Sequence, residues 1–331
     1  MIRMAQYGTK HGHAAGKLKS MLDSPDVEVV GLYEPDAARR SEIESDGVYA
    51  QIRFFDSEEE MLGDDSIVAI ASEGLNDESL DQTESIVAAG KHVWYDKPAG
   101  DNWVQLQKVV AEAKEKSLQI QMGFMLRYHS GFSQISEWAR AGFLGNIYAI
   151  RAHMSTNIKP EARAVIAASH YGGIYFDLAG HMLDQVVWIL GRPEKVTTFL
   201  RNDTGVVPDF QDNTLGVFEY EKALALVDIA AIEPQPMARR FEVYGEKGSA
   251  ILVEPFEPGH AIRLCLTEAA GDYRKGEQMV EFEGIGRQGL YDLELASLLR
   301  VIQDQQEPDR SLDHELLVQE TLLRGNGAIE A

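Results

Sequence analysis

Acidic residues and a histidine recur at helical spacing in the stretch "FDLAGHMLDQVVWILG". Asp177 and His181 are four positions apart and Asp184 follows three positions later, so on a helix all three share one face. Most flanking residues are apolar, and a histidine in such a helix is often only a satisfied core residue. A carboxylate one turn away can instead hold the imidazole in one tautomer and bring its pKa near neutrality. We single out Asp177 and His181 as candidate catalytic residues.

A lysine directly precedes a proline at the end of an apolar run, in "VWYDKPAG". If the run is a strand of a parallel sheet, Lys97 and Pro98 lie at its carboxyl end, where ligands bind. Burial shifts a lysine pKa toward neutrality and makes the amine a usable proton donor or acceptor. An exposed turn lysine is the alternative.

Glycine, lysine and histidine follow the first apolar run in "GTKHGH". Gly8 fits the first position of the G-x-G-x-x-G turn, whereas Lys10 and His13 replace the other two glycines. We expect Gly8 to make the turn and backbone N–H groups near Thr9, His11 and Gly12 to face a pyrophosphate. Lys10 is expected to lean outward or to lend its charge to the phosphates, and an ordinary strand-to-helix turn is the alternative.

The next apolar run ends in Glu34. A carboxylate at this place accepts both hydroxyls of an adenosine ribose and repels a 2′-phosphate, so it favours NAD over NADP. A solvated acid is the alternative, and Arg39 and Arg40 keep NADP binding conceivable. The remaining residues that we expect at the cofactor are Ser72, Glu73, Pro98, Lys97 and Arg127. Residues proposed for the substrate are Tyr128, Asn157, His170 and Tyr171.

A metal site is the competing interpretation of the histidines and aspartates. No H-E-x-x-H or comparable ligand spacing occurs, and His11 and His13 project to opposite sides if the segment is extended. We therefore predict no metal site.

The elements that position these residues change in type near residue 123. Before it, strand-like runs alternate with helix-like segments, including a short expected strand at 51–55, which predicts a doubly wound parallel sheet of the Rossmann type. After it, several strands follow one another, which predicts an α/β domain with an open, mostly antiparallel sheet. We divide the chain into a nucleotide-binding domain, 1–122, and a domain for substrate binding and oligomerisation, 123–331.

The composition limits the partners. The formal charge of the 331 residues is -22, which disfavours nucleic acid and anionic membranes as partners. The single cysteine, Cys265, has apolar neighbours in "IRLCLT" and is expected to be a buried strand residue. The sequence has no long apolar run and no signal-peptide pattern, so a cytoplasmic location is expected.

Taken in order, these motifs resemble the glucose-fructose oxidoreductase/inositol dehydrogenase (Gfo/Idh/MocA) family. "AAGKHVWYDKPAG" is similar to the family block A-G-K-H-V-x-x-E-K-P, and "GGIYFDLAGHMLDQVVWILG" to its G-G-G-x-x-x-D-x-G-x-H-x-x-D helix. Asp96 and Ala179 depart from the family's glutamate and glycine, and Lys10 and His13 from its loop glycines.

The resemblance implies that Lys97, Asp177 and His181 face the nicotinamide. It also implies an NAD(P)-dependent oxidoreductase of a sugar, polyol or related secondary alcohol, assembled as a homodimer or homotetramer through the open sheet. In our hypothesis His181 takes the hydroxyl proton, Asp177 orients the imidazole and Lys97 hydrogen-bonds the same oxygen, although Lys97 is an alternative proton carrier. A non-catalytic NAD sensor, or an enzyme that uses NAD for an internal redox step, are the alternative functions.

Overall fold

The computed structural model describes residues 1–330 and divides into two compact units. The first contains Met1–Phe124 and Gln288–Leu316, and the second contains Met125–Arg287 and the residues from Leu317 onward. The sequence-based division assigned 288–316 to the second domain, whereas this segment clusters with the first unit. Within that unit, Ser20 Oγ donates a hydrogen bond of 2.6 Å to Asp292 Oδ1, and Gln121 Nε2 donates one of 2.8 Å to the Glu294 carbonyl.

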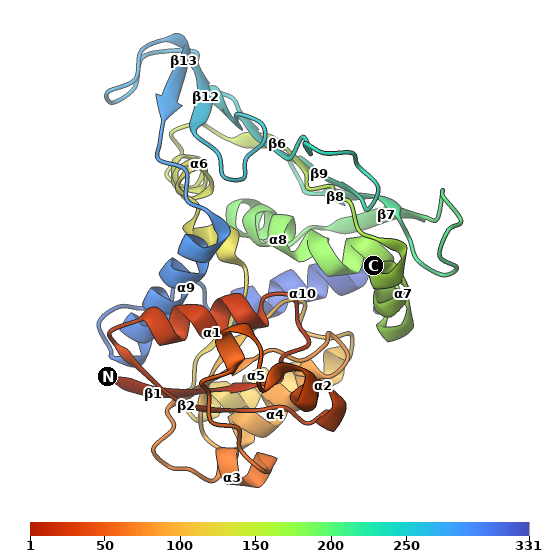
Figure 1. The fold of residues 1–331 in the computed structure, drawn as a ribbon. Helices are drawn as coiled ribbons and strands as arrows, with labels where there is room; N and C mark the ends of the chain where they lie inside the picture. Colours follow the sequence, from red (N-terminus) through yellow and green to blue (C-terminus); the bar gives the residue numbers. More distant parts are fainter. Residues whose placement is uncertain (331) are drawn as a thin grey trace. The chain divides into compact units, whose positions relative to one another are not determined.

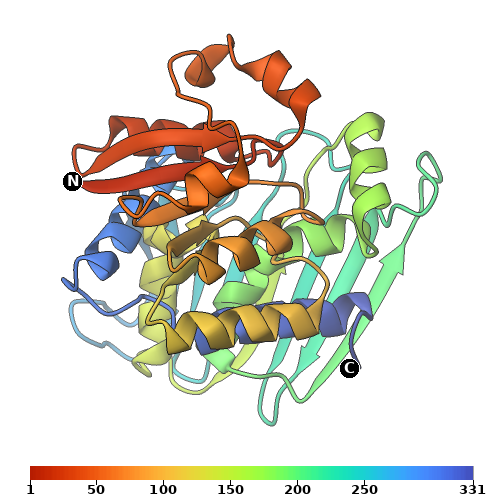
Figure 2. The same cartoon turned by 90° about the horizontal axis from the view of Figure 1, so that it is seen from below.

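The first unit is built on a parallel sheet with strand order β2-β1-β3-β4-β5 (Figures 1 and 2). The chain runs from β1 to β2 on one side and then crosses to β3 on the other. Strand order therefore reverses between β1 and β3, the place where such sheets bind ligands. The strands are β1 Ile2–Tyr7, β2 Val27–Tyr33, β3 Ala69–Ser72, β4 His92–Tyr95 and β5 Ile120–Met122.

Helices connect these strands, as the alternating pattern predicts. They are α1 Ala14–Asp23, α2 Ala37–Ile43, α3 Glu58–Leu62, α4 Ser79–Ala88 and α5 Trp103–Glu115, with a 3-10 turn at Gly47–Tyr49. Helix α9 Arg287–Ile302 comes later in the chain and connects no strands of this sheet. Local capping sets where helices begin: Asp36 accepts the amides of Ala38 and Arg39 at the start of α2, an arrangement that satisfies unpaired N–H groups. The expected strand at 51–55 is wrong, because only an isolated bridge joins Phe54 to Leu32.

The second unit contains a larger sheet with order β13-β12-β11-β10-β6-β9-β8-β7. Its pairings are antiparallel except that of β6 with β9, which confirms the mostly antiparallel sheet. The strands are β6 Ile147–His153, β7 Lys195–Arg201, β8 Asn213–Glu219, β9 Leu224–Ala230, β10 Arg240–Gly245, β11 Gly248–Leu252, β12 Ala261–Leu266 and β13 Gly276–Glu281. The helices are η2 Met125–Tyr128, α6 Ser130–Arg140, α7 Pro160–Ser169 and α8 Gly173–Leu190, with α10 Leu312–Asn326 beginning in the first unit and ending in the second.

One face of this sheet is covered and the other is open. Helix α8 contacts β6, β8 and β9, and α6 contacts β10 and β11 (Figure 1). On the opposite face, Phe199 and Met279 are 55% and 51% exposed. Cys265 is also exposed on β12, so the expectation of a buried cysteine is wrong. Strand alternation explains the correction, because Leu264 and Leu266 point into the core and turn Cys265 outward.

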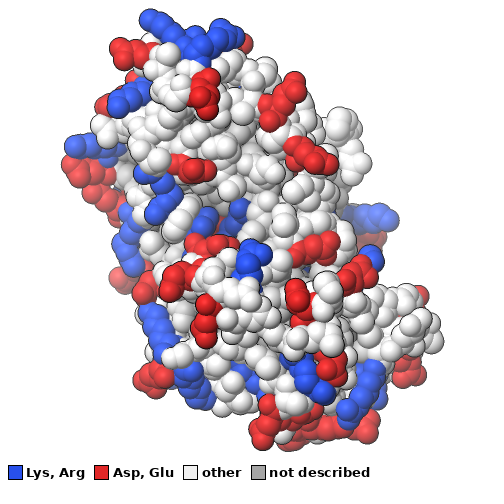
Figure 3. Space-filling view, turned by 90° about the vertical axis from the view of Figure 1, so that its left-hand side faces the viewer, with Lys and Arg blue, Asp and Glu red and all other residues white. Residues whose placement is uncertain are grey.

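Charged side chains of both signs are interspersed over the surface seen in Figure 3. Within residues 1–330, no helix combines the length and the hydropathy needed to cross a bilayer.

Gly8 directly follows β1 and has a backbone conformation that would be strained in a residue with a side chain. Its φ is +79°, and an added Cβ would lie 2.9 Å from the Gly74 nitrogen. We expect Gly8→Ala to lower the free energy of unfolding by about 2 kcal/mol, because the backbone must shift or hold a strained φ. Urea denaturation of the ligand-free protein measures the change.

Gly12→Ala in the same turn is the matched control. An added Cβ at Gly12 meets nothing within 4 Å, so its effect should stay within about 0.5 kcal/mol. Equal free energies of unfolding for the two variants would contradict this account of the turn.

Candidate functional site

The turn after β1 exposes backbone donors beside the start of α1. The Gly8 amide donates to the Tyr33 carbonyl at 2.8 Å and the His11 amide to the Glu73 carbonyl at 3.0 Å. In the described part of the chain, no acceptor is present for the amides of Thr9, Lys10 and Gly12. In this geometry the His11 amide is engaged by the protein, whereas the other three amides are not.

Lys10 is already neutralised by acidic neighbours. Its ammonium lies 2.7 Å from Glu78 Oε1 and 3.2 Å from Asp36 Oδ2. The hydrogen bond to Glu78, assisted by Asp36, raises the pKa of Lys10 above its usual value. The lysine that replaces a loop glycine is thus held by carboxylates of its own unit.

Glu34 is buried and anchored at the end of β2. Its Oε2 accepts the Thr9 hydroxyl at 2.6 Å, and its Oε1 accepts the Asp36 amide at 3.0 Å. Arg39 Nε in turn donates to Thr9 Oγ1 at 3.3 Å. These contacts place the Glu34 carboxylate directly beside the Gly8 turn.

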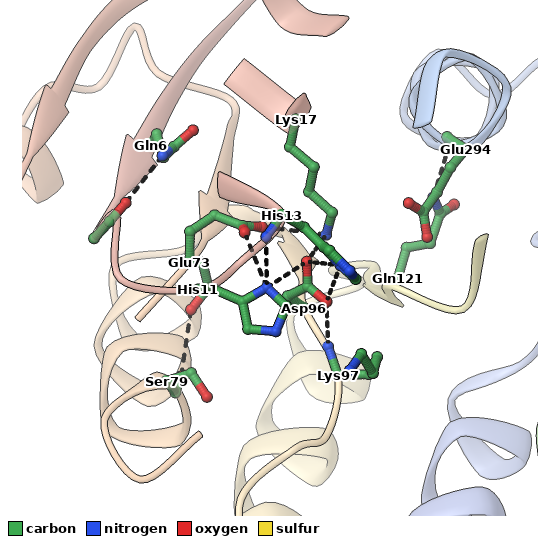
Figure 4. A network of polar contacts seen from close by, with 12 residues as sticks. Gln6, His11, His13, Lys17, Glu73, Ser79, Asp96, Lys97, Gln121 and Glu294 are labelled. Atoms are coloured by element: carbon green, nitrogen blue, oxygen red, sulfur yellow. Dashed lines mark hydrogen bonds and ion pairs between the residues drawn. The ribbon is translucent and has the colours of Figure 1, made fainter. Parts of the chain in front are cut away.

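Asp96 is the centre of a buried polar cluster (Figure 4). Its Oδ2 lies 3.1 Å from His11 Nδ1, from His13 Nδ1 and from Lys17 Nζ, and its Oδ1 accepts the Lys97 amide at 2.8 Å. Burial by itself would raise the pKa of the Asp96 carboxyl, but the two histidines and Lys17 outweigh it and hold this pKa well below its usual range.

The two histidines converge on this carboxylate. Their rings meet edge to face with centroids 4.6 Å apart, because the segment is a turn rather than an extended strand. The extended segment, under which we expected them to project to opposite sides, is therefore not formed. Burial lowers the pKa of His13 to about 4 despite the opposing effect of Asp96.

Lys17 is a buried residue that the sequence analysis missed. Its ammonium lies 3.2 Å from Glu73 Oε1 as well as 3.1 Å from Asp96, and 4.6 Å from the centroid of the Trp94 ring. Burial alone would lower the pKa of Lys17, but Asp96, Glu73 and Glu294 outweigh it and raise that pKa. The helical period in the sequence indicates that Lys17 is buried, because position 17 shares a helix face with the buried residues Ala14 and Met21.

Ser72 and Glu73 point into the first unit. Ser72 Oγ donates to the Ser79 carbonyl at 3.3 Å and accepts from Thr83 at 3.1 Å, so it ties β3 to α4. Glu73 is fully buried beside Lys17, and its burial raises the pKa of its carboxyl well above the usual value. In this geometry both side chains are therefore engaged with other residues of the first unit.

Lys97 and Pro98 follow β4, as expected from "WYDKP". The Lys97 residue is only 3% exposed, and its peptide bond to Pro98 is cis. Lys97 is thus held at the carboxyl end of the parallel sheet, in the same unit as the Gly8 turn.

In the second unit, α8 carries the predicted catalytic pair. Asp177 is half-buried, and His181, one turn later, is 2% exposed. The helix begins at Gly173, where an added Cβ would lie 2.4 Å from the Gln211 carbonyl oxygen. This close approach fixes the start of the helix and thereby the positions of Asp177 and His181 along it.

Arg127 and Asp184 form a buried ion pair that sequence reasoning did not pair. Arg127 Nε and Nη2 donate to Asp184 Oδ1 at 3.0 and 2.8 Å, and Gln185 donates to Asp184 Oδ2 at 3.0 Å. The pair joins η2 to α8. We expected Arg127 at the cofactor, but in this structure its positive charge is neutralised by Asp184.

The expected substrate residues all lie in the second unit, at different depths. Asn157 and Tyr171 are exposed, Tyr128 is half-buried, and His170 is buried with its ring centroid 4.1 Å from that of Phe176 on α8. The structure therefore brings His170 to the helix that carries Asp177 and His181. Gly8, Thr9, Lys10, His11, Gly12, Glu34, Ser72, Glu73, Lys97 and Pro98 belong to the first unit.

Curated relatives match part of the chain. It is 23% identical to the rhizopine catabolism protein MocA of Rhizobium meliloti, over 53% of each protein. It is 25% identical to inositol 2-dehydrogenase of Salmonella typhimurium, over 68% of this chain and 66% of that protein. The matched region thus spans between about half and two thirds of these relatives' lengths.

A solved structure agrees over nearly the whole chain. GenD2 from gentamicin A biosynthesis, solved in complex with NAD, has a TM-score of 0.77 at 19% identity and covers 99% of this chain and 93% of that one. This likeness shows the fold.

Two family descriptions account for most of the sequence. Residues 3–124 match the oxidoreductase family with an NAD-binding Rossmann fold, and residues 132–251 match the GFO/IDH/MocA C-terminal domain. With both units matched in this order, the chain belongs to the Gfo/Idh/MocA oxidoreductase family, and its N-terminal part is that family's NAD-binding Rossmann fold.

Proposed function

We propose that this protein is an NAD-dependent dehydrogenase of a secondary alcohol in a sugar, polyol or related compound. The proposal rests on one observation: this member of the family has the full set of proton-transfer groups. Lys97 follows β4, while Asp177 and His181 lie one turn apart on α8. A protein that only sensed NAD would have no need of this set. The inositol 2-dehydrogenase relative supports a polyol-like substrate.

The residues around the Gly8 turn fit NAD. The amides of Thr9, Lys10 and Gly12 have no protein acceptor among the described residues, and backbone N–H groups at a helix start suit a pyrophosphate. Glu34, placed beside them, suits the ribose hydroxyls. Glu34, Asp36 and Glu78 gather negative charge at this turn, which disfavours a 2′-phosphate.

In the proposed mechanism His181 and Lys97 act on the substrate hydroxyl, and Asp177 acts through His181. His181 accepts the hydroxyl proton, and Asp177 orients the imidazole and stabilises its charged form. Lys97 hydrogen-bonds the same oxygen and stabilises the developing alkoxide. When bound, NAD supplies the carbon that takes up the two electrons and the hydrogen from the alcohol carbon.

Removing either basic group should slow the chemistry far more than it weakens NAD binding. We expect Lys97→Ala and His181→Asn each to lower kcat about 10²- to 10⁴-fold, the usual contribution of an acid-base group. NAD affinity should change much less, since the pyrophosphate and the ribose are assigned to the backbone amides of the Gly8 turn and to Glu34. Initial rates over a panel of inositols and other polyols, with NAD titrations, measure both.

Lys108→Ala and His260→Ala, at exposed positions, are the matched controls and should keep wild-type rates. If Lys97 and His181 act on one oxygen, the double variant should lose less than the product of the single effects. Wild-type kcat in both single variants would refute the assignment. NAD binding without turnover would favour a sensor, and turnover without net NAD reduction an internal redox step.

The charge of Glu34 should set cofactor preference. In Glu34→Gln the shape is kept and the charge is lost, so we expect NAD to bind about 10-fold more weakly and the preference over NADP to shrink. Glu44→Gln, an exposed acid of the same unit, should leave both affinities unchanged. Fluorescence titration with each nucleotide tests this, and an unchanged NAD to NADP ratio in Glu34→Gln would contradict the role.

We extend the proposal to a homodimer or homotetramer that pairs through the open face of the large sheet. Apolar side chains on this face support it, since Phe199, Leu224 and Met279 are each at least half exposed. A cytoplasmic location belongs to the same proposal, because a chain with a single cysteine forms no intramolecular disulfide that would need an oxidising compartment.

Placing a charge on this face should weaken the assembly. We expect Phe199→Glu to dissociate the oligomer at micromolar concentrations, because an unpaired carboxylate would be buried at the interface. Val165→Glu, at an exposed site on α7, is the control and should assemble as wild type. Sedimentation velocity measures the mass, and a monomeric wild type would refute the interface.

A further inference from the structure

The Asp96 cluster has a donor set that no part of the proposed dehydrogenase mechanism uses. His11 and His13 come from the turn after β1, and Asp96 from the residue after β4 (Figure 4). One ligand-type atom from each lies within 4.8 Å of the other two. All three belong to the first unit, so the arrangement depends on that unit alone.

The spacing of these atoms matches that of metal ligands. Zn–N and Zn–O bonds of about 2.0 to 2.2 Å in a tetrahedral site separate neighbouring donor atoms by about 3.3 to 3.5 Å. The distances from Asp96 Oδ2 to the two Nδ1 atoms are 3.1 Å. To bind an ion, Asp96 Oδ2 and the two Nδ1 atoms therefore need to move apart by only a few tenths of an ångström.

His11 directs its Nδ1 atom toward Asp96. This nitrogen also lies within hydrogen-bond distance of the His13 amide, at 3.2 Å. The same Nδ1 faces the Asp96 carboxylate at 3.1 Å. At this distance the nitrogen and the oxygen are joined by a hydrogen bond, and a metal ion in the place of its proton would bind both atoms.

Buried carboxyl groups outnumber buried ammonium groups around the cluster. Lys17 is the nearest ammonium, 3.1 Å from Asp96 Oδ2, and Glu73 lies 3.2 Å from the same lysine. Even with Lys97 counted, the two buried lysines face three buried carboxyl groups, those of Asp96, Glu73 and Glu294. Glu73 Oε2 also lies 3.8 Å from His11 Nδ1, close enough to become a further ligand after a small side-chain movement.

We propose that His11, His13 and Asp96 bind a divalent first-row transition metal ion such as Zn²⁺ or Co²⁺. Two imidazoles and one carboxylate are a donor set that these ions favour over Mg²⁺ or Ca²⁺. The ion joins the nucleotide-binding turn to the end of β4, next to Lys97. The site is independent of the proposed dehydrogenase activity, because none of the three residues is assigned to proton transfer.

Cobalt spectroscopy of the full-length, untagged protein tests the site without NAD or substrate. After chelator treatment and dialysis, Co²⁺ titration should give a visible d–d absorption band that saturates at one equivalent and is displaced by Zn²⁺. His11→Ala and His13→Ala should lose the band or bind at least 10-fold more weakly. His260→Ala, which removes an exposed imidazole, should behave as wild type.

Circular dichroism establishes that each variant is folded, and His11→Gln and His13→Gln replace any alanine variant that is not. The wild-type titration is decisive by itself, since absence of a saturable band overturns the site. An intact band in folded His13 variants also overturns it. Because the readout needs no turnover, a failed metal site leaves the dehydrogenase proposal standing, and a failed dehydrogenase assay leaves the metal site standing.

Discussion

The ion pairing of Lys17 with Asp96 and Glu73 is the constraint on which the first unit depends. The three residues come from α1, from the end of β4 and from the end of β3, and each is 2% exposed or less. Ions taken out of water are tolerated only where they pair closely, since the desolvation cost is several kcal/mol per ion. The ends of two strands and the first helix are therefore tied to one another at the point where strand order reverses.

This constraint also explains two residues whose side chains carry no part of the ion pair. An added Cβ at Gly123 would lie 2.8 Å from Asp96 Oδ1 and 3.1 Å from Lys17 Nζ. The glycine after β5 thus leaves the space that the ion pair occupies. Trp94 supports the same lysine with its ring face, an interaction that gains strength where water is excluded.

The sequence predicts the elements well because their signals are local. Parallel strands buried on both faces are short apolar runs, and residues such as Asp36 mark helix starts. The contact of His13 with Asp96 has no such signal, because it joins residues 83 positions apart. The exposure of Cys265, in contrast, was predictable. The alternation in "IRLCLT" places Cys265 on the same face as the exposed Arg263, so the strand period predicts its exposure and the apolar neighbours do not.

The replaced loop glycines are compatible with a nucleotide-binding turn because each new side chain has a partner inside the first unit. Lys10 is paired with Glu78 and Asp36, and His13 with Asp96. Asp96 is itself one methylene shorter than the glutamate of the family motif, which leaves space for an imidazole. The side chains at positions 13 and 96, which both depart from the family motifs, are thus in contact with each other. Since both side chains are engaged with protein groups, the backbone amides of the turn remain the groups that a phosphate meets.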